Sequence, residues 1–122
     1  MSHITELAER YLAVWNEPDA EVRRRAIAAL WTEDGSYVDP LFSGEGHAAI
    51  EALVAATRCQ FRGHVFRIIS YVDAHHNIAR FTWELSPVGG GECPVIGFDV
   101  LVAAHDGRLR GVYGFLDKVP SS

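Results

Sequence analysis

Asp99 is the residue whose surroundings most directly indicate chemistry. It stands within CPVIGFDVLVAA, residues 93–104, where the other side chains are apolar or, for glycine, absent. Burying an isolated ionised carboxylate costs on the order of several kcal/mol. Asp99 is therefore paired with a cation, bound to a metal, held neutral, or turned toward a cavity, and the stretch itself leaves these states open.

Alternation along a strand favours an inward direction for Asp99. Successive side chains of a strand point to opposite faces, so Asp99 shares its face with Val95, Gly97, Leu101 and Ala103. The opposite face of the stretch is equally apolar, so we expect both faces to be covered. Asp99 is predicted to point into the interior or into a pocket.

Asp39 is a second carboxylic acid whose neighbours could adapt it to chemistry. It precedes Pro40 and lies between Tyr37 and the pair Leu41–Phe42. An ordinary Asp-Pro turn would leave a solvated acid without a special role. The aromatic and apolar flanks instead favour a partly desolvated group suited to proton transfer. Tyr11, on the apolar face of a predicted helix, has the same two interpretations, and a core role is the commoner one.

A scaffold must position these residues, and the first half of the chain is predicted to be helical. Apolar residues recur at helical spacing up to about Trp15, and Pro18 then opens a second helix over about Asp19 to Trp31. A third helix is predicted within residues 43–57. Asp39 therefore lies between two helices, in a short extended segment.

The second half is predicted to form strands. Extended segments at residues 64–72, 78–88, 94–104 and 109–119 are separated by the turns DAHHN, GGGEC and HDGR. Short turns make such strands antiparallel neighbours. Helices followed by a strand meander give an α+β fold class.

Two features of the predicted sheet bear on the site. Gly97, Gly111 and Gly114 within strands would permit strong curvature, so the sheet could wrap the helices. The orientation of the strand at 78–88 stays open. Its inward face carries either Phe81 and Trp83 or Arg80, Thr82 and Glu84.

Composition narrows the classes of function. The chain has 122 residues, 48% of them hydrophobic, and a formal net charge of −5, which suits one domain over residues 1–122. The acidic balance argues against a nucleic-acid partner. No run has the length of a membrane span and no N-terminal stretch resembles a signal peptide, so we expect a cytoplasmic protein without membrane contact. Two distant cysteines fit a reducing compartment, and no Cys/His spacing indicates a metal site.

The order of elements and two motifs resemble the SnoaL-like and ketosteroid isomerase branch of the nuclear transport factor 2-like superfamily. The first motif is SYVDP, residues 36–40, followed by a Gly-containing loop into a helix. The second is Asp99 in the third long strand, followed by the turn Asp106-Gly107-Arg108. The resemblance covers nearly the whole chain. It implies a cystatin-like fold in which a cone-shaped, curved antiparallel sheet wraps three N-terminal helices around a deep apolar pocket, and a homodimer formed through the outer sheet face.

Similarity to ketosteroid isomerase implies roles for three residues. Asp39 would be the general base that takes a proton from the carbon next to a carbonyl, and Tyr11 and a neutral Asp99 would donate hydrogen bonds to the enolate oxygen. An Arg80 or Arg110 guanidinium bonded to Asp99 would contradict this role of Asp99. The resemblance implies no cofactor and no metal. Further ligand-lining residues are expected to be Trp15, Trp31, Tyr37, Phe42 and Phe61.

The resemblance leaves the reaction open. The favoured function is cofactor-free acid/base chemistry on a small apolar carbonyl compound, by isomerisation or cyclisation through proton abstraction. A hydrolase or dehydratase of the SnoaL-like kind would use the same pocket. Outside the enzymes, the alternative is a non-catalytic ligand-binding or protein-interaction module, because fold alone does not settle function.

Overall fold

The computed structural model describes residues 3–120, and within them it confirms the three predicted helices. They are α1 (His3–Asn16), α2 (Ala20–Leu30) and α3 (His47–Gln60). Asp19 caps α2, because its side chain accepts hydrogen bonds from the backbone N–H groups of Glu21 and Val22. No helix in this part of the chain is long and apolar enough to cross a membrane. The ends of the predicted domain, residues 1 and 122, lie outside the described residues.

One sheet of seven strands follows within residues 3–120. The strands are β1 (Trp31–Val38), β2 (Ser43–Glu45), β3 (His64–Ile68), β4 (Asp73–His75), β5 (Ile78–Pro87), β6 (Val95–Ala103) and β7 (Leu109–Lys118). Their order is β2-β1-β7-β6-β5-β3, with β4 paired to β5. The four long strands of the second half are antiparallel neighbours, as predicted.

The first strand corrects the expectation of a purely antiparallel sheet. β1 runs parallel to β7, with Tyr37 opposite Val112 and Val38 opposite Tyr113. Parallel pairing needs a long connection between the two strands, and the chain from α3 to β6 supplies it. The sheet is therefore mixed, and the Asp39 turn that follows β1 lies beside the last strand.

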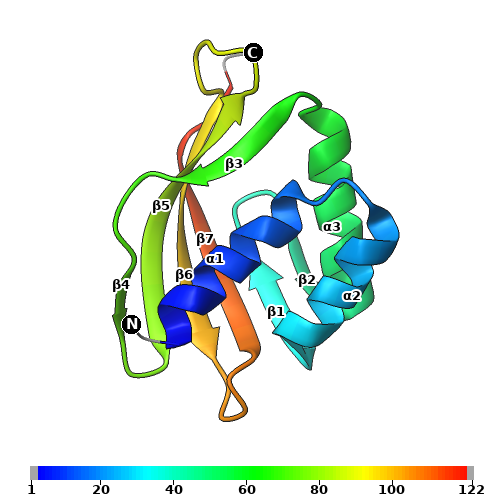
Figure 1. The fold of residues 1–122 in the computed structure, drawn as a ribbon, viewed down its shortest axis with the longest axis vertical. Helices are drawn as coiled ribbons and strands as arrows, with labels where there is room; N and C mark the ends of the chain where they lie inside the picture. Colours follow the sequence, from blue (N-terminus) through cyan, green and yellow to red (C-terminus); the bar gives the residue numbers. More distant parts are fainter. Residues whose placement is uncertain (1–2, 121–122) are drawn as a thin grey trace.

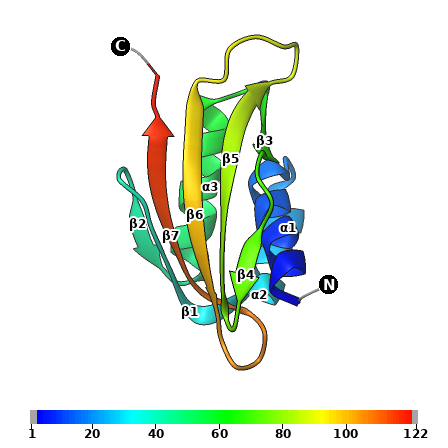
Figure 2. The same cartoon turned by 90° about the vertical axis from the view of Figure 1, so that its left-hand side faces the viewer.

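The helices lie on one side of the curved sheet (Figure 1 and Figure 2). The core fills the space between these two layers, which is the arrangement of an α+β domain. Burial alternates along β5, so that Phe81, Trp83 and Leu85 are buried while Arg80 is exposed. The strand orientation left open by the sequence is thus the one with Phe81 and Trp83 facing the helices.

Gly97 has a packing role in addition to the predicted curvature. It pairs with Trp83 across β5 and β6, and a Cβ at Gly97 would lie 2.1 Å from Cζ2 of that indole. Only a residue without a side chain leaves room for the ring. The absence of a side chain at Gly97 therefore brings Trp83 onto the inner sheet face, next to Asp99.

Candidate functional site

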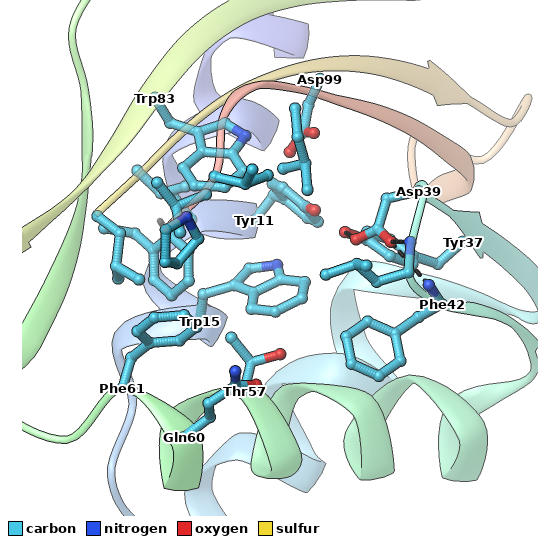
Figure 3. A pocket seen from close by; sticks show the side chains of 18 residues that line it. Tyr11, Trp15, Tyr37, Asp39, Phe42, Thr57, Gln60, Phe61, Trp83 and Asp99 are labelled. Atoms are coloured by element: carbon cyan, nitrogen blue, oxygen red, sulfur yellow. Dashed lines mark hydrogen bonds between the residues drawn. The ribbon is translucent and has the colours of Figure 1, made fainter. Parts of the chain in front are cut away.

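A cavity of about 310 Å³ lies between the inner sheet face and the helices. Most of its wall is apolar, and three polar side chains that could do chemistry, Tyr11, Asp39 and Asp99, face it (Figure 3). The remaining lining residues are Leu12, Trp15, Tyr37, Leu41, Phe42, Thr57, Gln60, Phe61, Phe66, Trp83, Leu85, Val95, Leu116, Val119 and Pro120.

Asp99 is buried and has no cation beside it. Its exposed fraction is 3%, and its Oδ1 atom has no hydrogen-bond partner among the described residues. The two arginines that could have paired with it do not. The Nε of Arg80 donates to Asp73 at 2.9 Å on the opposite face, and Arg110 is exposed. The predicted inward direction of Asp99 is confirmed by this burial.

Burial raises the pKa of Asp99 to about 7. Loss of water around the ionised form is the main cause, and the negative charge of Asp39 adds to it. The Trp83 indole and the Tyr11 hydroxyl, both facing Asp99 (Figure 3), act in the opposite direction and lower the pKa. The raised pKa favours the protonated form of Asp99, in which the carboxyl group can donate a hydrogen bond.

Tyr11 reaches the cavity from α1. Its ring makes edge contacts with Trp15, Trp31 and Phe81, at centroid distances of 6.3, 6.2 and 6.4 Å. These contacts fix the ring and remove water from it. Burial, with the negative charge of Asp99, raises the pKa of Tyr11 well above its usual value. The phenol therefore keeps its proton and can act as a hydrogen-bond donor.

Asp39 is held by three donors at the end of β1. The backbone N–H groups of Leu41 and Phe42 donate to Oδ1 at 2.7 and 2.8 Å. The Tyr37 hydroxyl donates to Oδ2 at 2.6 Å. An Asp side chain that bonds the backbone two residues on is typical of a turn, and Pro40 preorganises this one. The turn thus fixes the direction of the carboxylate at the cavity wall.

Gly114 of β7 separates the two carboxyl groups. A Cβ at this position would lie 2.9 Å from Oδ1 of Asp99 and 3.2 Å from Cβ of Asp39. The Asp99 side chain comes from β6, which pairs with β7, and the Asp39 turn follows β1, which also pairs with β7. The sheet order therefore brings together two acids that are far apart in the sequence.

The predicted site residues meet at this cavity with one exception. Trp31 does not line it, which corrects the prediction. α2 ends at Leu30, so Trp31 is the first residue of β1 and its ring packs in the core behind Tyr11, with Cε3 2.7 Å from where a Cβ of Gly35 would be. Sequence reasoning missed the contact of Trp83 with Asp99. It also missed the hydrogen bond from Tyr37 to Asp39, although the i, i+2 spacing in YVD was a signal for it.

Metal-binding groups are not assembled in the described residues. Within residues 3–120, no group of three or more His, Cys, Asp or Glu side chains could hold a metal ion. The chemistry that the cavity offers through its own side chains is proton transfer and hydrogen bonding.

Comparison with known proteins identifies the family. Residues 8–112 match the sequence model of the SnoaL-like domain. The chain belongs to the SnoaL-like family. The resemblance inferred from the SYVDP motif and the Asp99 strand is thereby confirmed for the family. Among curated proteins, none matches this SnoaL-like chain.

Solved structures agree with this assignment. A protein from Agrobacterium tumefaciens str. C58, named as a candidate isomerase of the SnoaL-like family, is 40% identical with a TM-score of 0.90, and the match covers 96% of this chain and 99% of that one. A candidate SnoaL-like polyketide cyclase from Jannaschia sp. CCS1 is 16% identical with a TM-score of 0.72, covering 93% and 86%. A de novo designed protein with a curved β-sheet is 13% identical with a TM-score of 0.73, covering 96% and 88%. The last two show the fold alone.

Proposed function

We propose that this SnoaL-like protein is a cofactor-free acid/base enzyme that acts on a small apolar carbonyl compound. The observation that carries the proposal is Asp99, a buried carboxyl group without a cation that faces the cavity together with the Tyr11 hydroxyl. A structural acid would be expected to have a partner. Two adjacent hydrogen-bond donors in an apolar cavity instead suit an oxygen atom that gains negative charge during a reaction.

The proposed reaction begins with proton abstraction. The Asp39 carboxylate takes a proton from the carbon next to the carbonyl, the C–H electron pair forms the enolate C=C bond, and the carbonyl π pair moves to oxygen. Tyr11 and protonated Asp99 donate hydrogen bonds to that oxygen. In a substrate with a β,γ C=C bond, the enolate is a dienolate. Neutral Asp39 then returns the proton to its γ-carbon, the oxygen electron pair re-forms the C=O bond, and the C=C bond moves to the α,β position, which gives an isomer. In a cyclisation, the enolate carbon attacks a second carbonyl of the same molecule, whose oxygen takes the proton from Asp39.

The cavity supports the choice of substrate class. A volume of about 310 Å³ suits a small organic molecule, and its wall is mainly aromatic and aliphatic. An apolar medium strengthens hydrogen bonds to a developing negative charge, because water does not compete for them. The name of the structure that is 40% identical, a candidate isomerase of the SnoaL-like family, fits the same reaction class.

Exchange of α-protons tests the proposal without knowledge of the natural substrate. 2-Tetralone, an apolar ketone with acidic α-protons, is incubated in D₂O with the protein, and loss of its α-proton signal is followed by NMR. We expect catalysed exchange by the wild type. Asp39→Asn removes the base and should slow the exchange by about 10²-fold or more. Tyr11→Phe should slow it by about 10²-fold, because one oxyanion donor is lost.

Asp34→Asn is the matched control for the Asp39 variant. Asp34 is an exposed acid on β1, the strand that leads into the Asp39 turn, and it does not line the cavity, so this variant should keep the wild-type rate. Exchange by Asp39→Asn at the wild-type rate would contradict the assignment of the base. A wild type that binds the ketone but does not exchange its protons would favour the ligand-binding alternative over the enzyme.

A further inference from the structure

A second hollow lies on the other side of Phe61. It has a volume of about 330 Å³ and is formed by the last turns of α3, the segment leading into β3, and α2. Unlike the apolar cavity, it is lined by cationic and polar side chains: Arg23, Arg58, Cys59, Arg62 and His64. We call this hollow the arginine cleft. Its remaining lining residues are Pro18, Ala55, Phe61 and Gly63. No Asp or Glu lines the cleft, although the chain has a formal net charge of −5.

One of the three arginines is already neutralised. Arg23 is 5% exposed, and its Nε and Nη2 donate to the two carboxylate oxygens of Glu51 at 2.6 and 2.9 Å. Its Nη1 donates to the backbone carbonyl of Glu17 at 2.8 Å. Arg23 therefore joins α2 to α3, and the excess positive charge of the cleft comes from Arg58 and Arg62.

Arg58 and Arg62 have no carboxylate partner within residues 3–120. Nη1 of Arg58 donates to the backbone carbonyl of Trp15 at 2.9 Å, which fixes the guanidinium without neutralising its charge. Nη2 of Arg62 lies 3.7 Å from Sγ of Cys59. Each guanidinium presents five N–H donors, so most donors of both side chains remain for a ligand.

We propose that the arginine cleft binds an oxyanion group, a phosphate or a carboxylate. A guanidinium matches such groups by donating two parallel hydrogen bonds, and charge-assisted bonds of this kind are the strong ones. Two guanidinium groups one helical turn apart in sequence, at the mouth of one hollow, can hold the same anion. The hollow is large enough to admit the group.

Phe61 lies between the arginine cleft and the apolar cavity, because it lines both. The oxyanion therefore has two possible sources. It is either a free anion or the charged end of a molecule whose apolar body occupies the cavity. The second source rests on the proposed function, since it needs the cavity to hold a ligand, whereas the first does not.

Titration with inorganic phosphate tests the cleft directly. Amide shifts of the ¹⁵N-labelled protein are followed at constant ionic strength, with Gly63 as the reporter inside the cleft. We expect saturable shifts, and binding weakened about tenfold or more in the double variant R58Q/R62Q. R62Q alone should weaken binding too, and it leaves the fold intact because Arg62 is exposed. R110Q, an exposed arginine outside the cleft, should bind like the wild type.

A pair of ligands distinguishes the two sources. 2-Naphthol and 6-hydroxy-2-naphthoic acid share an apolar body and a phenol, and only the second has a carboxylate. Tighter binding of the acid that disappears in R58Q/R62Q identifies the anion as the charged end of the cavity ligand. Equal binding of both ligands, together with saturable phosphate binding, identifies a free anion.

The proposal is overturned if the phosphate-induced shifts stay linear and 6-hydroxy-2-naphthoic acid binds no better than 2-naphthol. It is also overturned if saturable phosphate binding, or tighter binding of the acid, is unchanged in R58Q/R62Q. The arginines would then serve only to hold Trp15 and the end of α3. Exchange of 2-tetralone protons is measured on the same variants. Because 2-tetralone carries no anion and Arg62 does not line the cavity, exchange by R62Q reports on the proposed function independently of the cleft.

Discussion

Asp39 and Asp99 carry the same side chain and line the same cavity, but they differ in burial and in hydrogen-bond partners. Asp39 accepts three hydrogen bonds at the end of β1. Asp99 has an Oδ1 atom without a partner and is almost completely buried. Burial among apolar groups favours the neutral form of Asp99, in which it can donate a hydrogen bond. The three donors around Asp39 instead fix the direction of its side chain. This difference allows one site to hold a base and an acid of the same chemical type.

Stability should depend on pH through Asp99. Its pKa is about 7 in the folded protein and about 3.9 in the unfolded chain. Between these values the folded state binds more protons, so the free energy of unfolding falls as pH rises from about 4 to about 7. The loss is on the order of a few kcal/mol, since one unit of pKa shift is worth about 1.4 kcal/mol. Denaturant unfolding of the wild type and Asp99→Asn, across this range, measures it.

The neutral asparagine in Asp99→Asn has no such titration. Above pH 7 this variant should therefore be more stable than the wild type, and the advantage should shrink as the pH is lowered toward 4. Exchange of 2-tetralone protons by the wild type should also decline above pH 7, because Asp99 loses the proton that it donates. A pH-independent difference in stability between the two proteins would contradict a buried acid that titrates near neutrality.

Tyr37 is a positioning residue in the proposed mechanism, because it acts through Asp39. Tyr37→Phe removes the 2.6 Å hydrogen bond to Oδ2 and keeps the ring that packs on Trp15. We expect kcat for proton exchange to fall by about tenfold, with KM nearly unchanged, since the cavity wall is preserved. A rise in KM at constant kcat would instead indicate that Tyr37 contacts the substrate.

At the residue scale, local patterns predicted part of the site. The inward direction of Asp99 follows from alternation within one apolar stretch, and the Asp39 turn follows from Pro40. The prediction that Trp31 lines the pocket was wrong, because α2 ends at Leu30 and a shift of one residue in a helix end changes the direction of the next side chain. The sequence did not decide which face of β5 points inward, because Phe81 and Trp83 alternate with Arg80 and Thr82. The first pair would suit an apolar pocket, and the second pair would suit a polar one.

At the scale of the elements, β7 is the strand that holds the two acids in place. Gly114→Ala would put a methyl group 2.9 Å from Oδ1 of Asp99 and 3.2 Å from Cβ of Asp39. Contacts this short force the side chains or the strand to shift. We expect proton exchange to fall by about 10²-fold, because such a displacement is enough to misalign a catalytic group, while the circular dichroism spectrum stays that of the wild type.

Gly111→Ala is the control for the same strand. The nearest atoms to its new Cβ belong to the Tyr113 side chain, which is partly exposed and can move away. This variant should retain exchange activity. Equal losses in both variants would mean that β7 is generally intolerant of side chains, and that Gly114 has no special relation to the two acids.

Element order and strand pairing differ in how far the sequence predicts them. The three helices and four long strands have clear periodicity and turn signals, so they were predicted, with errors in their ends. The third helix was predicted from residue 43, but Ser43–Glu45 form β2 and α3 begins at His47. The parallel pairing of β1 with β7 joins residues separated by most of the chain, and no local pattern encodes it. The short strands β2 and β4 escaped prediction for a different reason. Each pairs locally with a neighbouring strand across a short turn, and each has only 3 residues, which is too few for alternation to indicate a strand.

At the scale of the whole molecule, we expect a homodimer formed through the outer sheet face. Tyr113 and Phe115 are 43% and 57% exposed there, and Phe115 lies 6.5 Å from Phe98 between ring centroids. Such an apolar patch favours a protein partner. Sedimentation should give a dimer for the wild type and a monomer for Phe115→Glu. Tyr71→Glu, which changes an exposed aromatic residue outside the strands, should remain dimeric.

The parallel pairing of β1 with β7 also has a consequence for synthesis on the ribosome. β1 and the turn with Asp39 emerge early, but their partner strand is translated last. A nascent chain that stops before residue 109 holds both acids but lacks the strand that brings them to the same cavity. The helices and the β5–β6 hairpin can form during translation, whereas the cavity must wait for release of the last strand. The emerging chain therefore exposes its apolar inner surface until β7 has left the ribosome, and this is the period in which chaperones matter most.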